Sequence, residues 1–336
     1  MGFIEINTKW ITPIYEQIKE SITRAIEQGL LKKGDKVPSI HNICREFGIS
    51  PGTVLKAYDD LCRIGILVSK KGKGYYISHT RVVKKLNIFM LFDRINTYKE
   101  MLYDSFIQHI GPNASVQVFF HHYDDIRFNS LIRDNLGKFN YYVIMPHFNH
   151  DVSEVLMKIP ENKLLIIDKE VPRLKGKYAA ICQNFKEDIY EALKSGLDQI
   201  SIYRQIVFAR SPSKFQFIPD GSVRGFEQFI AVHQLNGKVI PNIREHAIKP
   251  GELYIVFPDN DLIYLIKKAK ENKWKIGRDI GIIAFDDSPM KEVLEEGISV
   301  VSTDFEAMGK TAAGLILSGE KEKLHNPFSL ILRKSL

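Results

Sequence analysis

Polar residues directly follow several apolar runs in the chain after Leu86. Asp93, Arg94 and Tyr98 come after "NIFMLF", and Asp168 and Lys169 lie at the end of "LLIIDK". Carboxylates accept hydrogen bonds, arginine and asparagine donate them, and an aromatic ring stacks on the C–H face of a sugar. Together they predict a site for a polyhydroxyl ligand, although each residue alone is also typical of a helix cap or a loop. The candidate ligand-binding residues are Asp93, Arg94, Tyr98, His147, Asp168, Lys169, Arg224, Asn260 and Asp286.

Motifs for catalysis are missing from the sequence. It contains no G-x-S-x-G, no G-x-x-x-x-G-K-[ST] and no H-E-x-x-H. His147 and His150 have a spacing that suits a metal pair, but no third ligand is evident, so their pattern favours cleft lining. The cysteines Cys44, Cys62 and Cys182 fit neither a zinc site nor a disulfide framework. We therefore expect no catalytic residue, no metal and no cofactor.

The positive charge of the chain is concentrated in its first quarter. Residues 1–85 hold 15 Lys and Arg against 8 Asp and Glu, whereas residues 86–336 hold 32 of each kind. Such an asymmetry indicates a nucleic-acid-binding module joined to a neutral one. The alternative interpretation of the charge alone is a basic, solvated face.

The basic segment has the pattern of a helix followed by a helix-turn-helix. An apolar face recurs from Pro13 to Leu30, and a second apolar stripe extends to Ile64. Ser39 and Ser50 are the predicted N-caps of the second and third helices. Pro51 suits the first position of the third helix, because its missing N–H costs nothing there.

The third helix is expected to reach DNA with its first turn. In a helix-turn-helix, the N-terminal residues of the second helix of the motif contact base edges in the major groove. Gly52 has no side chain and lets the exposed N–H groups approach phosphates. Thr53 and Lys56 face outward on the same turns.

A basic hairpin is predicted after the third helix. "GILVSKKGKGYYIS" has the pattern of a strand, a glycine turn and a strand, with lysines at the tip. We expect it to form a wing over the phosphates. The candidate DNA-binding residues are Ser39, His41, Ser50, Gly52, Thr53, Lys56, Lys70, Lys71, Gly72 and Lys73.

These residues resemble the winged-helix domain of GntR-family transcription regulators. The similar stretches are "PIYEQIKESITRAIEQGLLKKGDKVPS" and, in the YtrA-like branch, "SPGTVLKAYDDLCRIGIL". The resemblance implies a DNA-contacting arginine where this chain has His41, whose charge depends on pH.

From Leu86 on, near-continuous apolar runs alternate with amphipathic helical patterns, which is typical of α/β folds with parallel sheets. The runs, each a predicted strand, are "NIFMLF", "VQVFF", "YYVIM", "LLIID", "RQIVFA", "LYIVF", "GIIAF" and "FSLIL". "LLIIDKEV", "SVRGFEQF", "VFPDNDLIYLIKKAKENKWKIGRDIGIIAFDD" and "VVSTDFEAMGKTAAGLI" resemble the effector domain of LacI-type regulators and type I periplasmic sugar-binding proteins. The resemblance implies two doubly wound subdomains joined by crossings near Ile200–Arg204, Val300–Asp304 and Gly319–His325. It also implies ligand contacts at Asp93, Asp168, Arg224, Asn260 and Asp286.

The expected organisation is a winged helix-turn-helix domain at 1–80, a basic linker at 81–85 and an α/β effector domain at 86–336. The expected subdomains are 86–202 plus 302–320, and 203–301 plus 321–336. No run is long enough to span a membrane and no secretory signal precedes the first helix, so we expect a cytoplasmic protein.

The expected function is that of a transcription regulator, a repressor of a sugar-utilisation operon. Its partners would be double-stranded operator DNA, a second copy in a homodimer, and an effector. A GntR-like head on a LacI-like body resembles arabinose-repressor-type and Bacteroidetes sugar regulators, which implies a pentose or deoxyhexose such as L-arabinose or L-fucose, or its phosphate. The alternatives are a constitutive DNA-binding protein whose body only dimerises, and a DNA-binding head fused to a carbohydrate-active enzyme.

Overall fold

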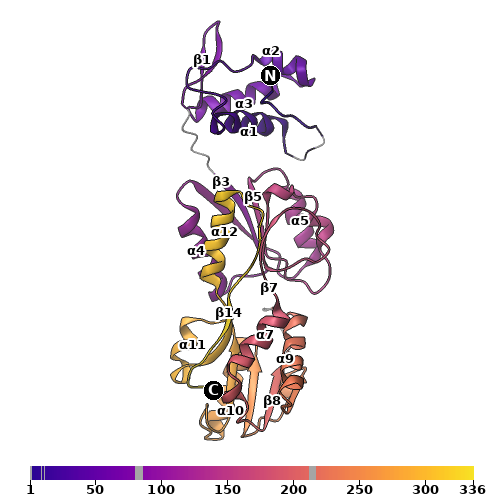
Figure 1. The fold of residues 1–336 in the computed structure, drawn as a ribbon, viewed down its shortest axis with the longest axis vertical. Helices are drawn as coiled ribbons and strands as arrows, with labels where there is room; N and C mark the ends of the chain where they lie inside the picture. The colour runs from indigo at the N-terminus through magenta and orange to yellow at the C-terminus, as the bar shows by residue number, and fades with distance from the viewer. Residues whose placement is uncertain (1, 9, 11, 80–85, 212–216) are drawn as a thin grey trace. The chain divides into compact units, whose positions relative to one another are not determined.

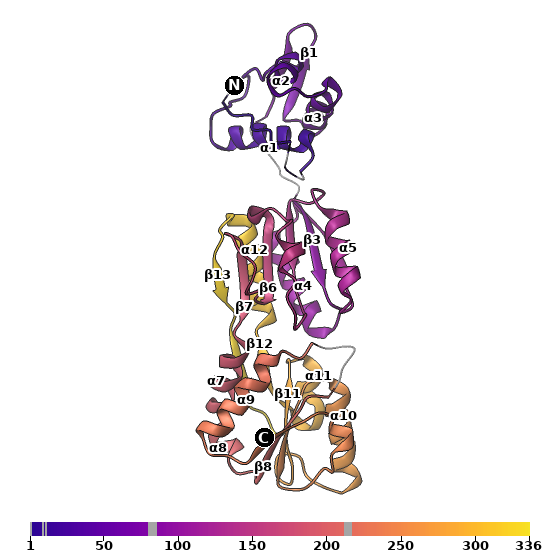
Figure 2. The same ribbon diagram turned by 90° about the vertical axis from the view of Figure 1, so that its right-hand side faces the viewer.

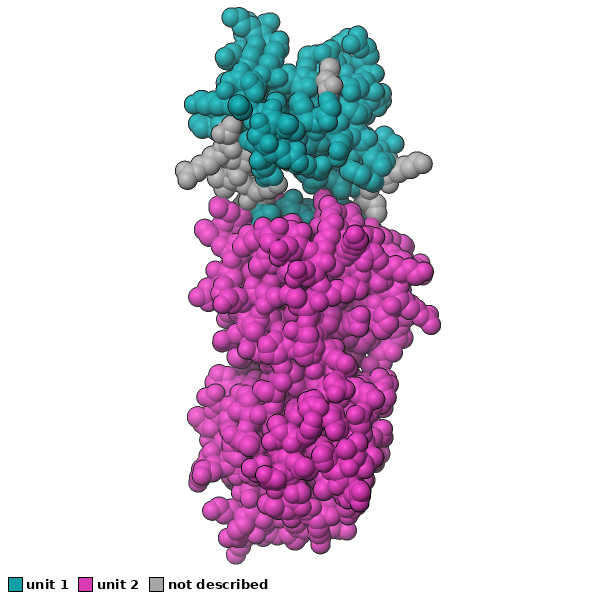
Figure 3. Space-filling view, in the orientation of Figure 1, with its two compact units in different colours: residues 1–86, 134–140 teal, residues 87–133, 141–336 magenta. Residues whose placement is uncertain are grey.

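The chain divides into two compact units. The computed structural model describes residues 2–8, 10, 12–79, 86–211 and 217–336, so the expected linker at 81–85 lies outside the described residues. One unit comprises residues 1–86 with 134–140, and the other residues 87–133 with 141–336 (Figure 3). No helix among the described residues is long and apolar enough to cross a membrane.

The first unit is a three-helix domain with a two-stranded hairpin (Figure 1). Its elements are α1 (Ile14–Glu27), α2 (Ile40–Phe47), α3 (Pro51–Arg63), β1 (Leu67–Lys70) and β2 (Gly74–Ile77). The helix starts are confirmed: Ser39 and Ser50 are the N-caps of α2 and α3, and Pro51 is the first residue of α3. The strands β1 and β2 are antiparallel, as the hairpin pattern predicts.

The core of this unit lies between the three helices. Ile18 and Ile22 of α1 pack with Val54 and Tyr58 of α3, all fully buried. Two predictions at helix ends are wrong, because Leu30 and Ile64 are 63% and 59% exposed. Both residues follow the last helical turn, where the 3.6-residue period no longer decides which way a side chain points.

The second unit contains two six-stranded sheets (Figures 1 and 2). The first sheet has the order β13-β7-β6-β5-β3-β4. Its strands are β3 (Leu86–Phe92), β4 (Ala114–Phe120), β5 (Tyr141–Ile144), β6 (Leu164–Lys169), β7 (Ala179–Gln183) and β13 (Lys323–His325). The helices that accompany it are α4 (Thr97–Ile110), α5 (Asp125–Asn135), α6 (Ser153–Leu156) and α12 (Phe305–Ser318). The helices α4 and α12 lie side by side (Figure 1).

The second sheet has the order β14-β12-β11-β10-β8-β9 and is parallel except at β14. Its strands are β8 (Gln205–Ala209), β9 (Gly237–Ile240), β10 (Glu252–Val256), β11 (Gly281–Phe285), β12 (Ser299–Thr303) and β14 (Phe328–Ile331). Its helices are α7 (Phe185–Ser195), α8 (Leu197–Ile200), α9 (Asp220–Val232), α10 (Asp259–Glu271) and α11 (Pro289–Val293).

Successive side chains of each strand point to opposite faces of the second sheet, so an apolar core forms on each face. Ile206 and Phe208 of β8 point into the core beneath α7 and α9, whereas Val207 and Ala209 point into the core beneath α10. A sheet covered by helices on both faces needs apolar residues at every strand position. This explains the unbroken apolar runs, and the α/β fold class with two doubly wound sheets is confirmed.

The three connections between the sheets differ in part from the expected ones. The first occurs between Gln183 and Phe185, well before the expected Ile200–Arg204, because α7 packs on α9 and β14 of the second sheet. The chain returns at Asp304, within the expected range, where β12 passes into α12. It crosses again at Asn326–Pro327, between β13 and β14, just after the expected range.

Candidate functional site

The exposed start of α3 is held by a serine cap. The Ser50 hydroxyl accepts from the Thr53 N–H at 3.3 Å and lies 2.9 Å from the Thr53 hydroxyl. Gly52 and Lys56 are exposed on the following turn. Ser39 caps α2 in the same way, through the Asn42 N–H at 3.2 Å, and His41 is exposed beside it. The first turns of both helices therefore present polar groups to solvent.

Aromatic rings support two of the exposed lysines. The Lys56 ammonium lies 3.7 Å from the ring centroid of Tyr15 in α1, and the Lys70 ammonium lies 4.5 Å from that of Tyr76 in β2. Lys71, Gly72 and Lys73 form the exposed hairpin tip, where Gly72 has a φ of +71° that suits glycine. These positions suit DNA contact, and each contact stays a prediction.

The second unit contains a cavity between its two sheets. The space between its atoms is about 420 Å³, which includes the part open to solvent, and about 40 Å³ of it can hold the centre of a water-sized molecule. Aromatic rings and a few polar side chains line it, and they come from the strand ends and helix starts of both sheets. The lining residues are Tyr98, His147, Asp168, Gln183, Phe185, Phe217, Pro219, Ser222, Phe257, Phe285, Asp286, Phe305 and Phe328.

A chain of buried polar groups forms the wall from the first sheet. His147 lies between two carboxylates, with Nδ1 2.8 Å from Asp93 Oδ2 and Nε2 2.5 Å from Asp168 Oδ2. Lys99 forms an ion pair with Asp93, and Gln183 Nε2 donates to Asp168 Oδ1 at 2.9 Å. All five side chains are at least nine-tenths buried, so the hydrogen bonds among them are little exposed to solvent.

The charges of this network stabilise one another. Burial opposes the charged form of His147, but the carboxylates of Asp93 and Asp168 outweigh it and raise the pKa of the imidazole. Burial likewise opposes ionised Asp93, yet His147 and Lys99 hold the pKa of this carboxyl well below its ordinary value. Because both ring nitrogens of His147 face acceptors, both carry hydrogen and the ring is cationic.

Asp286 faces the cavity from the second sheet. Burial raises the pKa of its carboxyl to about 7, with the charge of Asp168 adding to the effect and Lys291 opposing it. The residue has a φ of +59°, and Asp168 has a φ of +68°. Lys291 donates to the carbonyls of Phe285 and Asp286 at 2.7 Å each, which holds the end of β11 in this conformation. Such strained backbone is typical of functional sites.

The structure brings together only part of the predicted ligand-binding set. Tyr98, His147, Asp168 and Asp286 line the cavity, and Asp93 lies directly behind His147. Of the other predicted residues, Arg94 donates its backbone N–H to Asp93, Lys169 donates to the carbonyl of Glu170, and Arg224 and Asn260 are exposed on α9 and α10. None of these four lines the cavity, so a ligand role for them stays a prediction.

Sequence reasoning missed several residues of the site. Gln183 ends β7, a strand that the run pattern did not identify, and Ser222 lies two positions before Arg224. Lys99 and Lys291 sit on helices where a lysine normally faces solvent. A polar residue at the end of a parallel strand was the available signal for Gln183.

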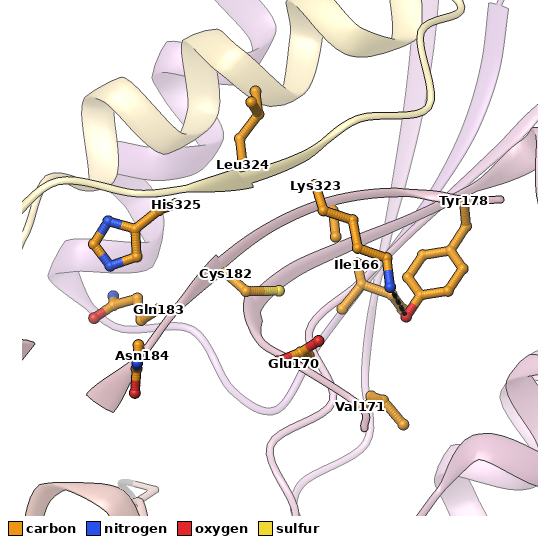
Figure 4. Close-up of a pocket in the computed structure, with 11 residues that line it drawn as sticks. Ile166, Glu170, Val171, Tyr178, Cys182, Gln183, Asn184, Lys323, Leu324 and His325 are labelled. Atoms are coloured by element: carbon orange, nitrogen blue, oxygen red, sulfur yellow. Dashed lines mark hydrogen bonds between the residues drawn. The ribbon is translucent and has the colours of Figure 1, made fainter. Parts of the chain in front are cut away.

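A second cavity lies beside the sheet edge formed by β7 and β13, with an empty volume of about 570 Å³ (Figure 4). Its lining includes Glu170, Tyr178, Cys182, Lys323 and His325. Lys323 Nζ donates to the Tyr178 hydroxyl at 3.2 Å, which the dashed line in Figure 4 marks. Burial raises the pKa of the Cys182 thiol, which makes it a poor nucleophile.

Metal-ligand clusters of three or more His, Cys, Asp or Glu are absent from the described part of the chain. The two histidines with metal-pair spacing have separate partners. His147 belongs to the buried network, whereas His150 Nε2 lies 2.8 Å from the exposed Asp125.

Family models match both parts of the chain. Residues 14–77 match the family described as bacterial regulatory proteins, gntR family, and residues 203–336 match a periplasmic binding protein-like domain. The HTH-type transcriptional repressor YtrA of Bacillus subtilis is 41% identical over 75 residues, which are 22% of this chain and 58% of YtrA. The mannosyl-D-glycerate transport/metabolism system repressor MngR of Escherichia coli is 35% identical over 107 residues, 32% of this chain and 41% of MngR. The chain thus spans about half the length of these relatives.

Solved structures share the fold of the second unit. A LacI family transcriptional regulator from Lactobacillus casei, solved with bound glucose, superposes with a TM-score of 0.60 at 16% identity, over 74% of this chain and 99% of that one. The chain therefore carries a GntR-family helix-turn-helix domain at residues 14–77, followed by a domain with the fold of periplasmic binding proteins and LacI-type regulators.

Proposed function

We propose that this protein is a ligand-responsive, DNA-binding transcription regulator. The observation that carries the proposal is that the start of α3 and a lysine hairpin are both exposed in one compact unit, in the segment that holds all of the net positive charge. Lysines near phosphates release counterions on binding, and the start of a recognition helix reaches base edges. The repressor names of YtrA and MngR support this assignment.

Within the DNA-binding unit we assign two kinds of contact. Lys70, Lys71 and Lys73 would contact phosphates, because they belong to the exposed hairpin and not to the first turns of the helix that would reach base edges. Thr53 and Lys56 would influence sequence choice, since they project from the first two turns of α3. Ser39, His41, Ser50, Gly52 and Gly72 complete the proposed interface.

The cavity between the two sheets would hold the effector. It combines carboxylates, an amide and aromatic rings, which suits the hydroxyls and C–H faces of a small sugar. The glucose in the Lactobacillus casei regulator, a protein with the same fold, supports a sugar as ligand. We therefore propose a monosaccharide or its phosphate, with a pentose or deoxyhexose such as L-arabinose or L-fucose as the first to test.

Closure of the two sheets on the ligand would change operator affinity. A ligand shifts a conformational equilibrium only through its different affinity for the two states. A ligand in this cavity contacts both sheets only when they are close together, so it favours that state. Coupling of this kind is typically about 1–3 kcal/mol, or roughly 5- to 150-fold in operator affinity. We propose that the regulated genes serve sugar utilisation and that a homodimer binds a two-fold operator.

The test is operator binding by the full chain, measured by fluorescence anisotropy with and without sugars. The proposal expects tight, salt-dependent binding and a sugar-dependent change in affinity. Operator binding that no ligand alters would favour the alternative of a constitutive DNA-binding protein whose second unit only dimerises. Conversion of the bound sugar to product, followed by NMR, would favour a fused carbohydrate-active enzyme.

A further inference from the structure

Among the residues that the structure describes, the lining of the cavity between the two sheets contains carboxylates and no lysine or arginine. Asp168 and Asp286 are among its lining residues, and none of the lining residues that the structure describes is a lysine or an arginine. In the wall behind them, the charges of Asp93, Lys99, His147 and Asp168 sum to zero when all four are ionised. No positive charge of this wall is therefore left over to neutralise an anionic ligand.

The two nearest buried lysines have partners of their own. Lys99 forms an ion pair with Asp93. Lys291 donates to two strand-end carbonyls and forms an ion pair with Asp259 at 2.9 Å. His147 has both ring nitrogens occupied by carboxylates. Each of these cations would have to break an existing contact before it could bind a phosphate.

Two residues that line the cavity have a buried polar atom without a hydrogen-bond partner, and one of them, Gln183, also lines the second cavity. Gln183 Oε1 and Ser222 Oγ are both without one, although the two residues are only 7% and 0% exposed. The amide of Gln183 must turn its NH₂ toward Asp168, since a carboxylate only accepts, so its oxygen is the end left unpaired. Buried polar atoms are almost always hydrogen-bonded, which indicates that a ligand supplies these contacts.

The chemistry of these groups defines the complementary ligand. Asp168, Asp286 and Gln183 Oε1 present oxygens that accept, and Ser222 Oγ both donates and accepts. The ligand must therefore be rich in donors, as a sugar with several hydroxyls is. Six phenylalanines and Tyr98 supply the apolar surface that the C–H faces of such a ring need.

We propose that this cavity binds an uncharged, hydroxyl-rich sugar, that it discriminates against phosphorylated and acidic forms of the same sugar, and that Gln183 and Ser222 are specificity-determining residues. This inference rests on the proposed function and narrows it. A phosphate or carboxylate on the ligand would lie close to Asp168 and Asp286, which are buried and partly buried, and repulsion between such charges is weakly screened by salt.

The test is a calorimetric binding panel on the full chain at pH 7.5, built from matched pairs. Glucose is compared with glucose 6-phosphate, glucuronate and glucosamine, and arabinose is compared with arabinose 5-phosphate. L-Fucose is added as a further neutral sugar. We expect at least one neutral sugar to bind, and its anionic partner to bind about 100-fold more weakly or not at all. An anionic or amino form that binds more tightly than its neutral parent would overturn the inference and leave the proposed regulator intact. Absence of binding by every member, with no change in operator affinity, would count against the proposed function itself.

Variants of the two residues separate a direct contact from a structural role. Ser222→Ala and Gln183→Met should each weaken binding of the neutral sugar about 3- to 10-fold, which is the loss expected for one neutral hydrogen bond. Glu227→Ala is the matched control, because Glu227 is exposed on the same helix, and it should change affinity less than about twofold. Wild-type affinity in both cavity variants would overturn the assignment of these residues.

A charge variant tests the discrimination itself. Asp286→Asn removes one of the two carboxylates. At pH 8.5, where the Asp286 carboxyl with its pKa of about 7 is ionised, the ratio of glucose to glucuronate affinity should fall at least about tenfold in this variant. If the substitution only disturbed the structure, it would weaken binding of glucose and glucuronate equally and leave the ratio of their affinities unchanged. An unchanged ratio would therefore contradict electrostatic exclusion.

Discussion

Nε2 of the His147 imidazole lies 2.5 Å from Oδ2 of the Asp168 carboxylate. His147 follows β5, and Asp168 lies near the end of the neighbouring parallel strand β6. The other ring nitrogen faces Asp93, so the ring is clamped between two buried carboxylates. This arrangement fixes the orientation of Asp168 at the cavity wall. The ion network therefore helps to define the shape of the cavity, together with apolar packing.

Removing His147 should strongly destabilise the second unit. His147→Leu leaves Asp93 and Asp168 facing each other in a buried site without their shared cation. Breaking a buried charge pair in this way typically costs about 3–5 kcal/mol. Urea unfolding followed by circular dichroism should show this decrease in stability. His150→Leu is the control, because its pair with Asp125 is exposed and such a pair contributes at most about 1 kcal/mol. Equal effects of the two substitutions would contradict the structure.

The carboxyl of Asp286 should make stability depend on pH. In the unfolded chain it loses its proton near pH 4, whereas in the folded chain it keeps the proton until its pKa of about 7. Between these values the folded state binds more protons, so the free energy of unfolding falls as pH rises. Asp286→Asn should therefore gain in melting temperature relative to wild type more at pH 8 than at pH 5. Asp198→Asn, at an exposed position, should show no such difference.

Replacing Lys71 and Lys73 by alanine should weaken DNA binding on every sequence. The plot of log affinity against log salt should flatten by about one unit for each lysine that no longer reaches a phosphate. Lys267→Ala, an exposed lysine on α10, should leave both the affinity and the slope unchanged. A double variant that keeps the wild-type salt slope would remove the hairpin from the DNA interface.

Lys56→Ala should alter sequence preference more than total affinity. Lys56 projects from α3 and is steadied by the Tyr15 ring, so its position relative to the helix is defined. Without this side chain at a base edge, discrimination at one operator position should relax by about 1–3 kcal/mol. Binding to a library of operators with single substitutions measures this. A uniform decrease in affinity across the library would instead assign Lys56 to a phosphate.

Local sequence signals were sufficient for the DNA-binding unit. Ser39, Ser50 and Pro51 mark helix starts because capping and proline geometry depend only on residues a few positions apart. The apolar runs likewise identified eight strands of the two sheets, since strands buried on both faces need apolar side chains throughout. Strands with small or polar residues, such as β7 and β9, lacked that signal.

The composition of the cavity was decided by tertiary packing. An ideal Cβ at Gly225 would lie 2.3 Å from the Lys186 carbonyl oxygen, so this glycine lets α9 press against α7 and fixes its rotation. That rotation turns Ser222 inward and Arg224 outward. Apolar periodicity is local, so it can indicate a helix with one buried face in this segment. Which polar residue at its edge reaches the cavity depends on a contact with another helix, and no local pattern records it.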